Sequence, residues 1–281
     1  MKHLIRLTAA VCAGMLTVFP AVSAAETDDP VRMLRDVLLG RESAAAAEDS
    51  DQNGDGILDA RDLTLIKRGL LPAHDWILEP KGTVHSGNAT FYGGGYEGGC
   101  AMLDPVPRDV WITAMNLPDY NCAELAGAYL EVTGELGSIF VLVTDLLPEG
   151  QKGDLDLYTD AFPLIAPAEK GRVPVTWRIV PLPAAEKEPV SYVYKEGSSP
   201  FWCSIQVRGH RYPLEKLEVL NADGEFVALP RKNYNYFEAA SGLGEGPFTF
   251  RLTDIYGQVV IDEDIPFTPD EMQKGNVQFP E

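Results

Sequence analysis

The sequence is poor in basic side chains, in cysteine and in histidine. Its 281 residues hold 23 Lys and Arg against 42 Asp and Glu, a formal net charge of −19. This acidic excess argues against electrostatic binding to nucleic acid or to an anionic membrane surface, so we expect neither as a partner. Four Cys and four His are too few for a disulfide-dense scaffold or a zinc-built fold.

Long apolar runs are also missing, apart from one at the N-terminus. The basic residues Lys2 and Arg6 precede an apolar stretch over 7–19, and small residues at 22–24 suit a cleavage site. The run is shorter than the roughly 18 residues that a membrane span requires. We therefore predict a signal peptide over 1–25 and a secreted, extracellular protein.

The abundant residues favour short strands and turns. With 26 Gly, 21 Pro and 45% hydrophobic residues, the chain is a folded protein of mainly β class. Hairpins are predicted over 128–144, 216–229 and 247–261, and alternation in the last of them predicts that Phe248, Phe250 and Leu252 face inward. A Pro-rich, charged stretch predicts a linker over 183–189, between domains over 76–182 and 190–281.

A loop over 51–62 has the spacing of a calcium site. Oxygen donors recur at alternate positions, and Gly56 stands where such a loop turns sharply. Ca²⁺ takes six to eight oxygen ligands, which a set of carboxylates, one amide and one main-chain carbonyl would supply. The predicted ligands are Asp51, Asn53, Asp55, Ile57, Asp59 and Asp62. The alternative is a solvated Asp- and Gly-rich loop without an ion.

Asp62 at the last loop position, followed by the apolar helical pattern of 63–71, resembles a dockerin repeat. Residues 29–40 resemble the helix of a first repeat whose loop is missing, so one Ca²⁺ is expected instead of two. The resemblance implies a dockerin-like helical segment over 26–75 and a cohesin module as partner. The truncation departs from the family pattern and puts ordinary cohesin binding in doubt.

The remaining motifs, in their order along the chain, resemble a bacterial expansin. They cover nearly all of the C-terminal 200 residues and lie at 87–100, 144–150, 155–162, 175–178, 194–202, 206–213, 233–237 and 277–281. The resemblance implies a six-stranded double-psi β-barrel followed by an immunoglobulin-like β-sandwich of the family 63 carbohydrate-binding type.

In the barrel, Asp156, Asp145 and Thr90 match the polar residues of the expansin groove. The resemblance gives Asp156 the acid-like position and makes Asp145 and Thr90 its hydrogen-bonding companions. Two facing carboxylates would raise the pKa of one of them. The alternative for either Asp is a structural cap on a turn or short helix. Leu147 stands where the family commonly has a groove aromatic.

Tyr92 and Tyr96 near the Gly-rich segment are candidates to replace that missing ring, or else they pack in the barrel. In the second domain, Phe201, Trp202 and Tyr234 match an aromatic row that stacks on a glucan chain, with Lys195 as a basic companion. Adjacent residues of a regular strand face opposite sides, so Phe201 and Trp202 require a bend or bulge. The alternative is that these rings are core residues.

The resemblance also extends to two cysteines. Cys100 and Cys122 stand where other expansin-like proteins carry cysteines, which implies a disulfide; two reduced thiols are the alternative. Cys203 is expected to be buried without a partner.

Together these patterns predict a monomeric, secreted expansin that binds cellulose and loosens plant cell wall without hydrolysis, tethered through dockerin and cohesin. The enzyme alternative is a weak family-45-like endoglucanase or lytic transglycosylase. The remaining alternative is a carbohydrate-binding targeting protein with an inert barrel.

Overall fold

The computed structural model describes residues 79–269 and 271–281. The predicted signal peptide, and the dockerin-like segment with its six calcium ligands, lie outside the described residues. Residues 75–281 form one compact unit. Within the part of the chain that the structure describes, no helix is long and apolar enough to cross a membrane.

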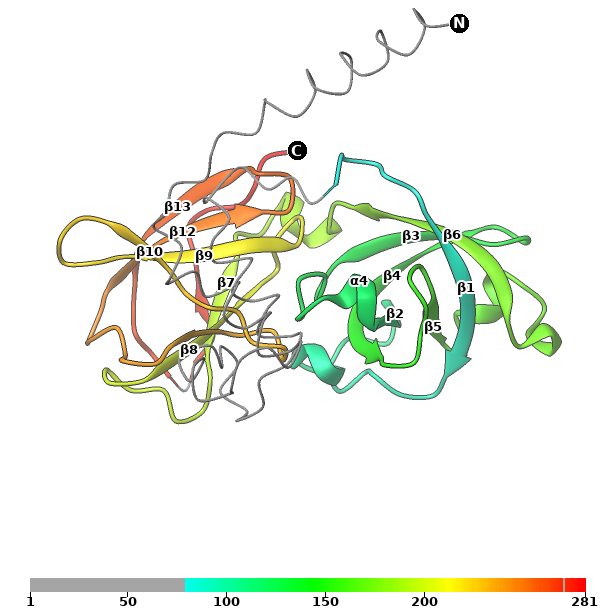
Figure 1. Cartoon of the computed structure of the whole chain (residues 1–281), viewed down its shortest axis with the longest axis horizontal. Coiled ribbons are helices and arrows are strands. Elements are labelled where there is room, and N and C mark those ends of the chain that lie inside the picture. The colour runs from blue at the N-terminus through cyan, green and yellow to red at the C-terminus, as the bar shows by residue number, and fades with distance from the viewer. Residues whose placement is uncertain (1–78, 270) are drawn as a thin grey trace, which may run out of the picture. The chain divides into compact units, whose positions relative to one another are not determined.

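Six strands close into a barrel, as the sequence predicts (Figure 1). They run in the spatial order β1-β5-β2-β4-β3-β6. Their bounds are β1 His85–Tyr92, β2 Trp111–Asn116, β3 Tyr129–Thr133, β4 Ser138–Leu147, β5 Leu155–Tyr158 and β6 Val173–Val180. Only β3–β4 is a local hairpin. The parallel pairs β1–β5 and β2–β4 join segments far apart in the sequence.

Alternation along the strands fills the barrel interior. In β6 every second residue from Val173 to Ile179 is buried, and the residues between them are exposed. Trp177 fills the most volume in this core, and its indole N–H donates to the carbonyl of Gly153 at 2.9 Å. Closure leaves no free edge on this sheet, so the barrel wall is a rigid support for side chains placed on it.

Two four-stranded sheets form the second half, with strand orders β10-β9-β12-β13 and β11-β8-β7-β14. Apolar side chains of both sheets make one core. The predicted inward residues Phe248, Phe250 and Leu252 are all buried in it. The bounds are β7 Ser191–Tyr194, β8 Cys203–Arg208, β9 Leu214–Leu220, β10 Phe226–Ala228, β11 Phe237–Ala239, β12 Phe248–Asp254, β13 Val259–Ile265 and β14 Gln273–Lys274.

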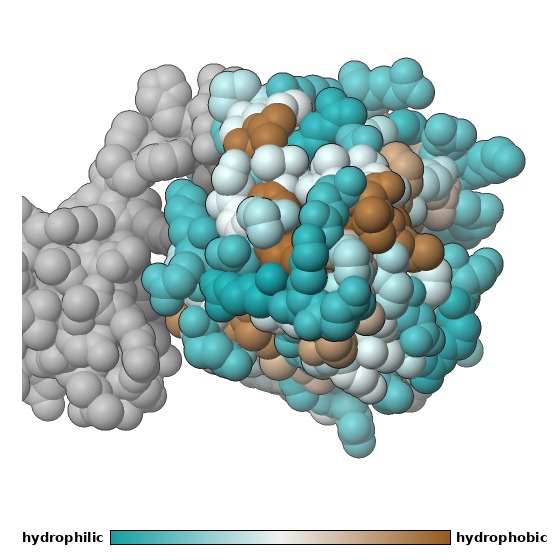
Figure 2. Space-filling model, turned by 90° about the vertical axis from the view of Figure 1, so that its right-hand side faces the viewer, coloured by the Kyte–Doolittle hydropathy of each residue, from teal (hydrophilic) through white to brown (hydrophobic). Residues whose placement is uncertain are grey.

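Helices among the described residues are short. They are η2 Gly99–Ala101, α4 Leu117–Tyr120, η3 Phe162–Leu164, η4 Ala168–Lys170 and η5 Pro183–Glu186. The stretch predicted as a semi-stiff linker contains η5, which is packed: Ala185 is buried, and its carbonyl accepts from the Arg211 guanidinium at 3.2 Å. The space-filling view in Figure 2 shows separate hydrophobic patches among hydrophilic side chains on one face.

Candidate functional site

Barrel closure places four residues in one row across adjacent strands. Thr90 on β1 is opposite Asp156 on β5, Asp156 is opposite Ala114 on β2, and Ala114 is opposite Asp145 on β4. The Thr90 hydroxyl donates to Oδ1 of Asp156 at 2.5 Å, so these two predicted residues are in contact. Asp145 lies two strands away, about 10 Å at ordinary strand spacing.

Asp145 is therefore not the hydrogen-bonding companion of Asp156 that the sequence led us to expect. Its Oδ1 accepts from the main-chain N–H groups of Cys100 and Leu146, each at 2.9 Å. Gly99 makes this possible, since a Cβ there would lie 2.8 Å from the Asp145 carboxyl carbon. The carboxylate fixes the loop that contains η2.

Asp156 opens into a cavity of about 290 Å³. Burial raises the pKa of its carboxyl, the Thr90 hydrogen bond opposes that rise, and the negative charge of Glu149 adds to it. The neighbouring carboxylate is thus Glu149, which sequence reasoning missed because it follows β4 in an irregular turn. The lining residues are Asn88, Thr90, Leu147, Glu149, Gly150, Gln151, Asp154, Leu155, Asp156 and Arg172.

An ion pair between buried Asp154 and exposed Arg172 closes one part of this cavity. Asp154 accepts from the Asn88 main-chain N–H at 2.8 Å and from the Arg172 guanidinium at 2.9 Å. Burial tends to raise the pKa of Asp154, but the bonds from Asn88 and Gln151 and the charge of Arg172 outweigh it and lower the pKa. A cation fixed in this way presents N–H donors to the cavity.

Neither tyrosine proposed as a substitute ring lines the cavity. Tyr96 is buried, its hydroxyl donates to the Val110 carbonyl at 2.9 Å, and the Arg108 guanidinium lies 4.1 Å from its ring centre. Tyr92 is partly buried with its hydroxyl inside; burial and then the charge of Asp145 raise its pKa. Leu147 is the side chain that lines the cavity at the position of the missing aromatic.

The expected disulfide is absent from the structure: Cys100 and Cys122 are both free and exposed. They lie in different surroundings. Cys100 belongs to η2, held on Asp145, and burial and then Asp145 raise the pKa of its thiol. Cys122 is close enough to Arg231 for their charges to interact. Cys203 is buried and free, as predicted.

The predicted aromatic residues lie in turns next to β8 and β11 of the β11-β8-β7-β14 sheet. Cys203, Ile205 and Val207 of β8 are in the core, so Trp202 before the strand points to the opposite side. The required bend is present: Ser199 and Trp202 bond to each other across a tight turn. Phe201 at its tip is 83% exposed, which rules out a core role.

Lys195 and Tyr234 are placed on the same sheet. The main-chain N–H of Lys195 donates to the Ser204 carbonyl at 2.8 Å, next to Trp202. Tyr234 lies in the turn that leads into β11, and β11 is antiparallel to β8. That turn is therefore at the far end of β8 from Trp202, on the order of 15–20 Å away.

The barrel and the sheet with this row are joined by polar contacts. Gln206 is fully buried, and its side-chain amide donates to the carbonyls of Ala101 at 2.9 Å and Asn235 at 3.2 Å. The Asn235 amide donates to the same Ala101 carbonyl at 3.1 Å. Since η2 also carries the N–H held by Asp145, one loop connects the barrel row to the sheet.

Comparison with known proteins agrees with this architecture. Over 208 residues the chain is 44% identical to Expansin-YoaJ of Bacillus subtilis strain 168. This alignment covers 70% of this chain and 88% of that protein. Two solved structures of Clavibacter michiganensis expansin, one a mutant in complex with cellohexaose and one apo, are each 29% identical with a TM-score of 0.64. Each alignment covers 71% of this chain and 99% of the other. No protein-family model matches the chain.

Proposed function

The chain belongs to the expansin family, and from this we propose that it binds cellulose or a related β-glucan and loosens plant cell-wall polysaccharide without hydrolysing it. The observation that carries the proposal is the Thr90–Asp156 pair in a cavity on the barrel wall. It is joined through η2 to a sheet that carries exposed aromatic residues. The complex of a Clavibacter michiganensis expansin with cellohexaose supports a glucan ligand.

In this proposal Asp156 is the groove residue that contacts the polymer. Its raised pKa keeps a proton on the carboxyl to a higher pH than in an exposed Asp. The protonated carboxyl would donate to a sugar oxygen, and the carboxylate would accept from a sugar hydroxyl. Thr90 holds the carboxyl in place, and Asp145 acts as a positioning residue through η2. Hydrogen bonds from Asp156 to the sugar would compete with the hydroxyl–hydroxyl contacts between glucan chains. The chains would then loosen without the breaking of a glycosidic bond.

Phe201, Trp202 and Tyr234 supply the affinity. Flat rings stack on the C–H faces of pyranose units and remove apolar area from water. Rings spread along one sheet suit a straight chain at the surface of insoluble cellulose. Lys195, whose main chain bonds to Ser204 of β8, would donate to sugar hydroxyls.

Weak glycan cleavage is the second candidate function, and one observation favours it. Glycosidases use two carboxylates, one as acid and one as base or nucleophile. Glu149 lines the same cavity as Asp156 and acts on its pKa, so a pair of carboxylates is present. The third candidate, a targeting protein with an inert barrel, would leave this pair without a role.

The N-terminal part of the proposal rests on the sequence. A signal peptide over 1–25 would send the protein out of the cell. The loop with Asp51, Asn53, Asp55, Ile57, Asp59 and Asp62 would bind one Ca²⁺ and order a dockerin-like segment for a cohesin module of a cellulosome. In the described part of the chain, no three His, Cys, Asp or Glu side chains are grouped to hold a metal.

The test is extension of isolated plant cell walls under constant load. The parent protein is expected to increase creep, and Asp156→Asn to abolish most of it while cellulose binding is kept. Equal creep with the variant would refute the groove role of Asp156, whereas a parent protein that binds cellulose without increasing creep would favour the targeting function. Reducing ends released from amorphous cellulose, lost in both Asp156→Asn and Glu149→Gln, would instead establish cleavage.

A further inference from the structure

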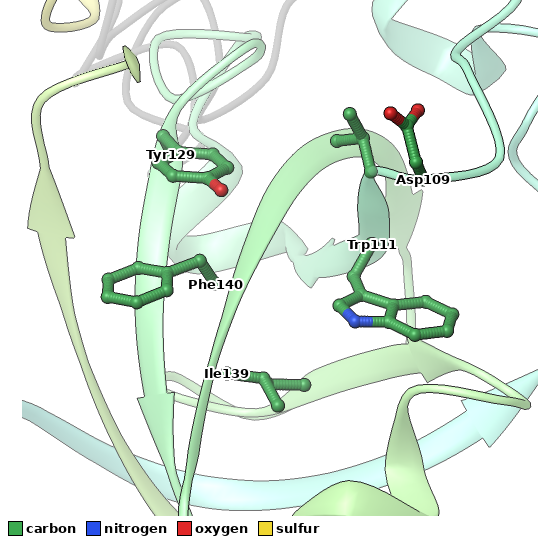
Figure 3. A pocket seen from close by; sticks show the side chains of 6 residues that line it. Asp109, Trp111, Tyr129, Ile139 and Phe140 are labelled. Atoms are coloured by element: carbon green, nitrogen blue, oxygen red, sulfur yellow. The ribbon is translucent and has the colours of Figure 1, made fainter.

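A second aromatic cavity lies on the outer wall of the barrel, away from the groove (Figure 3). Its volume is about 300 Å³, and it is lined by Asp109, Val110, Trp111, Tyr129, Ile139 and Phe140. Phe140 and Asp145 are on the same strand, five residues apart, which is about 16 Å. The cavity is therefore a site distinct from the Asp156 groove.

Its rings come from three adjacent strands: Tyr129 and Phe140 lie outside the barrel core, and Trp111 is partly buried against it. Leu130 of β3 and Val141 of β4 point into the barrel, so their neighbours Tyr129 and Phe140 point outward. Phe140 is 47% exposed. The rings of Tyr129 and Phe140 are 5.9 Å apart and nearly parallel, at 12°. Trp111 at the start of β2 is paired with the inward residue Val141, and in Figure 3 the ring of Phe140 points away from it.

The polar groups of the cavity select the chemistry of a ligand. The only charged side chain in its lining is the Asp109 carboxylate, a hydrogen-bond acceptor. Burial raises the pKa of Tyr129, so its hydroxyl stays a donor. The nearby Glu131 is neutralised by Arg178 at 2.6 Å. An anionic ligand would meet the Asp109 charge without a compensating cation in the lining.

We propose that the outward ring pair of Tyr129 and Phe140, with Asp109 of the same cavity, is a second carbohydrate site that binds one chain of a neutral β-glucan. Rings would stack on the pyranose faces, and Asp109 and the Tyr129 hydroxyl would bond to sugar hydroxyls at the rim. The inference rests on the proposed function in taking β-glucan as the polymer, but on none of its residues. A small open site with two rings suits a single soluble chain, whereas the row at Trp202 suits an insoluble surface.

The test is native gel electrophoresis of the full chain in gels that contain hydroxyethylcellulose, in a Trp202→Ala/Tyr234→Ala background. The matched variants are Phe140→Leu, which keeps apolar bulk but loses the flat ring, and Phe140→Tyr, which keeps the ring. We expect Phe140→Leu to weaken the retardation about tenfold, as loss of one stacked ring predicts, and Phe140→Tyr to preserve it. Melting temperatures should match, since Phe140 is half exposed.

Several results would overturn the inference. If Phe140→Leu is retarded as strongly as its background, the cavity accepts any apolar group and is not a sugar site. Equal retardation by polygalacturonate would refute a neutral ligand. A smaller particle for Phe140→Leu in size-exclusion chromatography would assign the cavity to contact between copies. If the background variant alone loses all retardation, this site fails while the proposed function stands. A parent chain that is not retained on insoluble cellulose fails the proposed function itself.

Discussion

Gln206 of the sandwich and Ala101 of the barrel are joined by a buried hydrogen bond of 2.9 Å between side-chain amide and main-chain carbonyl. The residue before Ala101 is held in turn by Asp145. The groove loop and the aromatic sheet are thus parts of one connected structure. A polymer that contacts both would meet surfaces whose relative placement is fixed by these bonds.

Replacing Gln206 tests that junction. In Gln206→Leu the Ala101 and Asn235 carbonyls lose a buried donor, which should lower the free energy of unfolding by about 1–3 kcal/mol. Calorimetry should show the change, and the barrel and sandwich should separate into two transitions. Gln273→Ala on β14, an edge strand of the same sheet, is the control. An unchanged single transition in Gln206→Leu would show that the junction depends on other contacts.

Asp154→Asn should lower stability at neutral pH by about 1–3 kcal/mol, because the charged bonds to Arg172 and Asn88 are weakened. The pKa of Asp154 is lowered in the folded state, so its contribution is present above the unfolded pKa near 3.8 and is lost as pH falls through the folded pKa. Urea unfolding at pH 7 and at pH 2 should show the difference shrinking. The control Asp160→Asn, at an exposed residue, should show no stability difference from the parent at either pH. A stability difference for Asp154→Asn that stays constant between the two pH values would contradict the ion pair.

Asp156→Asn should change the stability with pH in the sense opposite to Asp154→Asn. Burial raises the pKa of Asp156, so ionisation costs stability as pH rises from the unfolded pKa near 3.8 through the folded pKa. Asn is neutral at every pH and its Oδ1 still accepts from Thr90. Relative to the parent, the variant should gain stability between pH 3 and pH 7. Urea unfolding that gives the same stability difference between variant and parent at pH 3 and at pH 7 would refute a raised pKa of Asp156.

Trp202→Ala with Tyr234→Ala should abolish retention on insoluble cellulose. Each lost ring removes about 1.5–3 kcal/mol of burial against sugar, roughly tenfold to a hundredfold in affinity. Pull-down with increasing cellulose measures this. Phe226→Ala is the aromatic control, since Phe226 lies on the other sheet beneath Arg251. Parent-like retention of the double variant would show that binding lies elsewhere.

Calcium should bind the full chain with a stoichiometry of one. Calorimetric titration of the metal-free protein should show one site, and Asp51→Asn with Asp55→Asn should remove it, because the ion would lose two carboxylates. Two ions would mean that residues 29–40 follow a second functional loop. Protection of 51–71 from proteolysis by Ca²⁺ is the accompanying readout.

The sequence by itself determined which residues face inward and where the hairpins lie. Alternation is a local property with a period of two, so Phe248, Phe250 and Leu252 could be placed in the core from the chain alone. The bend at Phe201 and Trp202 followed in the same way, because neighbouring residues cannot share one face of a regular strand.

The tertiary structure decided the relations between distant segments. The row Thr90–Asp156–Ala114–Asp145 depends on how the barrel closes, and the strand pairing that sets it is not encoded in any local pattern. Closure put β2 between the two carboxylates, so Asp145 became a loop anchor and Glu149 the neighbour of Asp156. The junction at Gln206 and the ring cavity at Phe140 likewise join residues that only folding brings together, since contacts at long sequence separation follow from packing and not from periodicity.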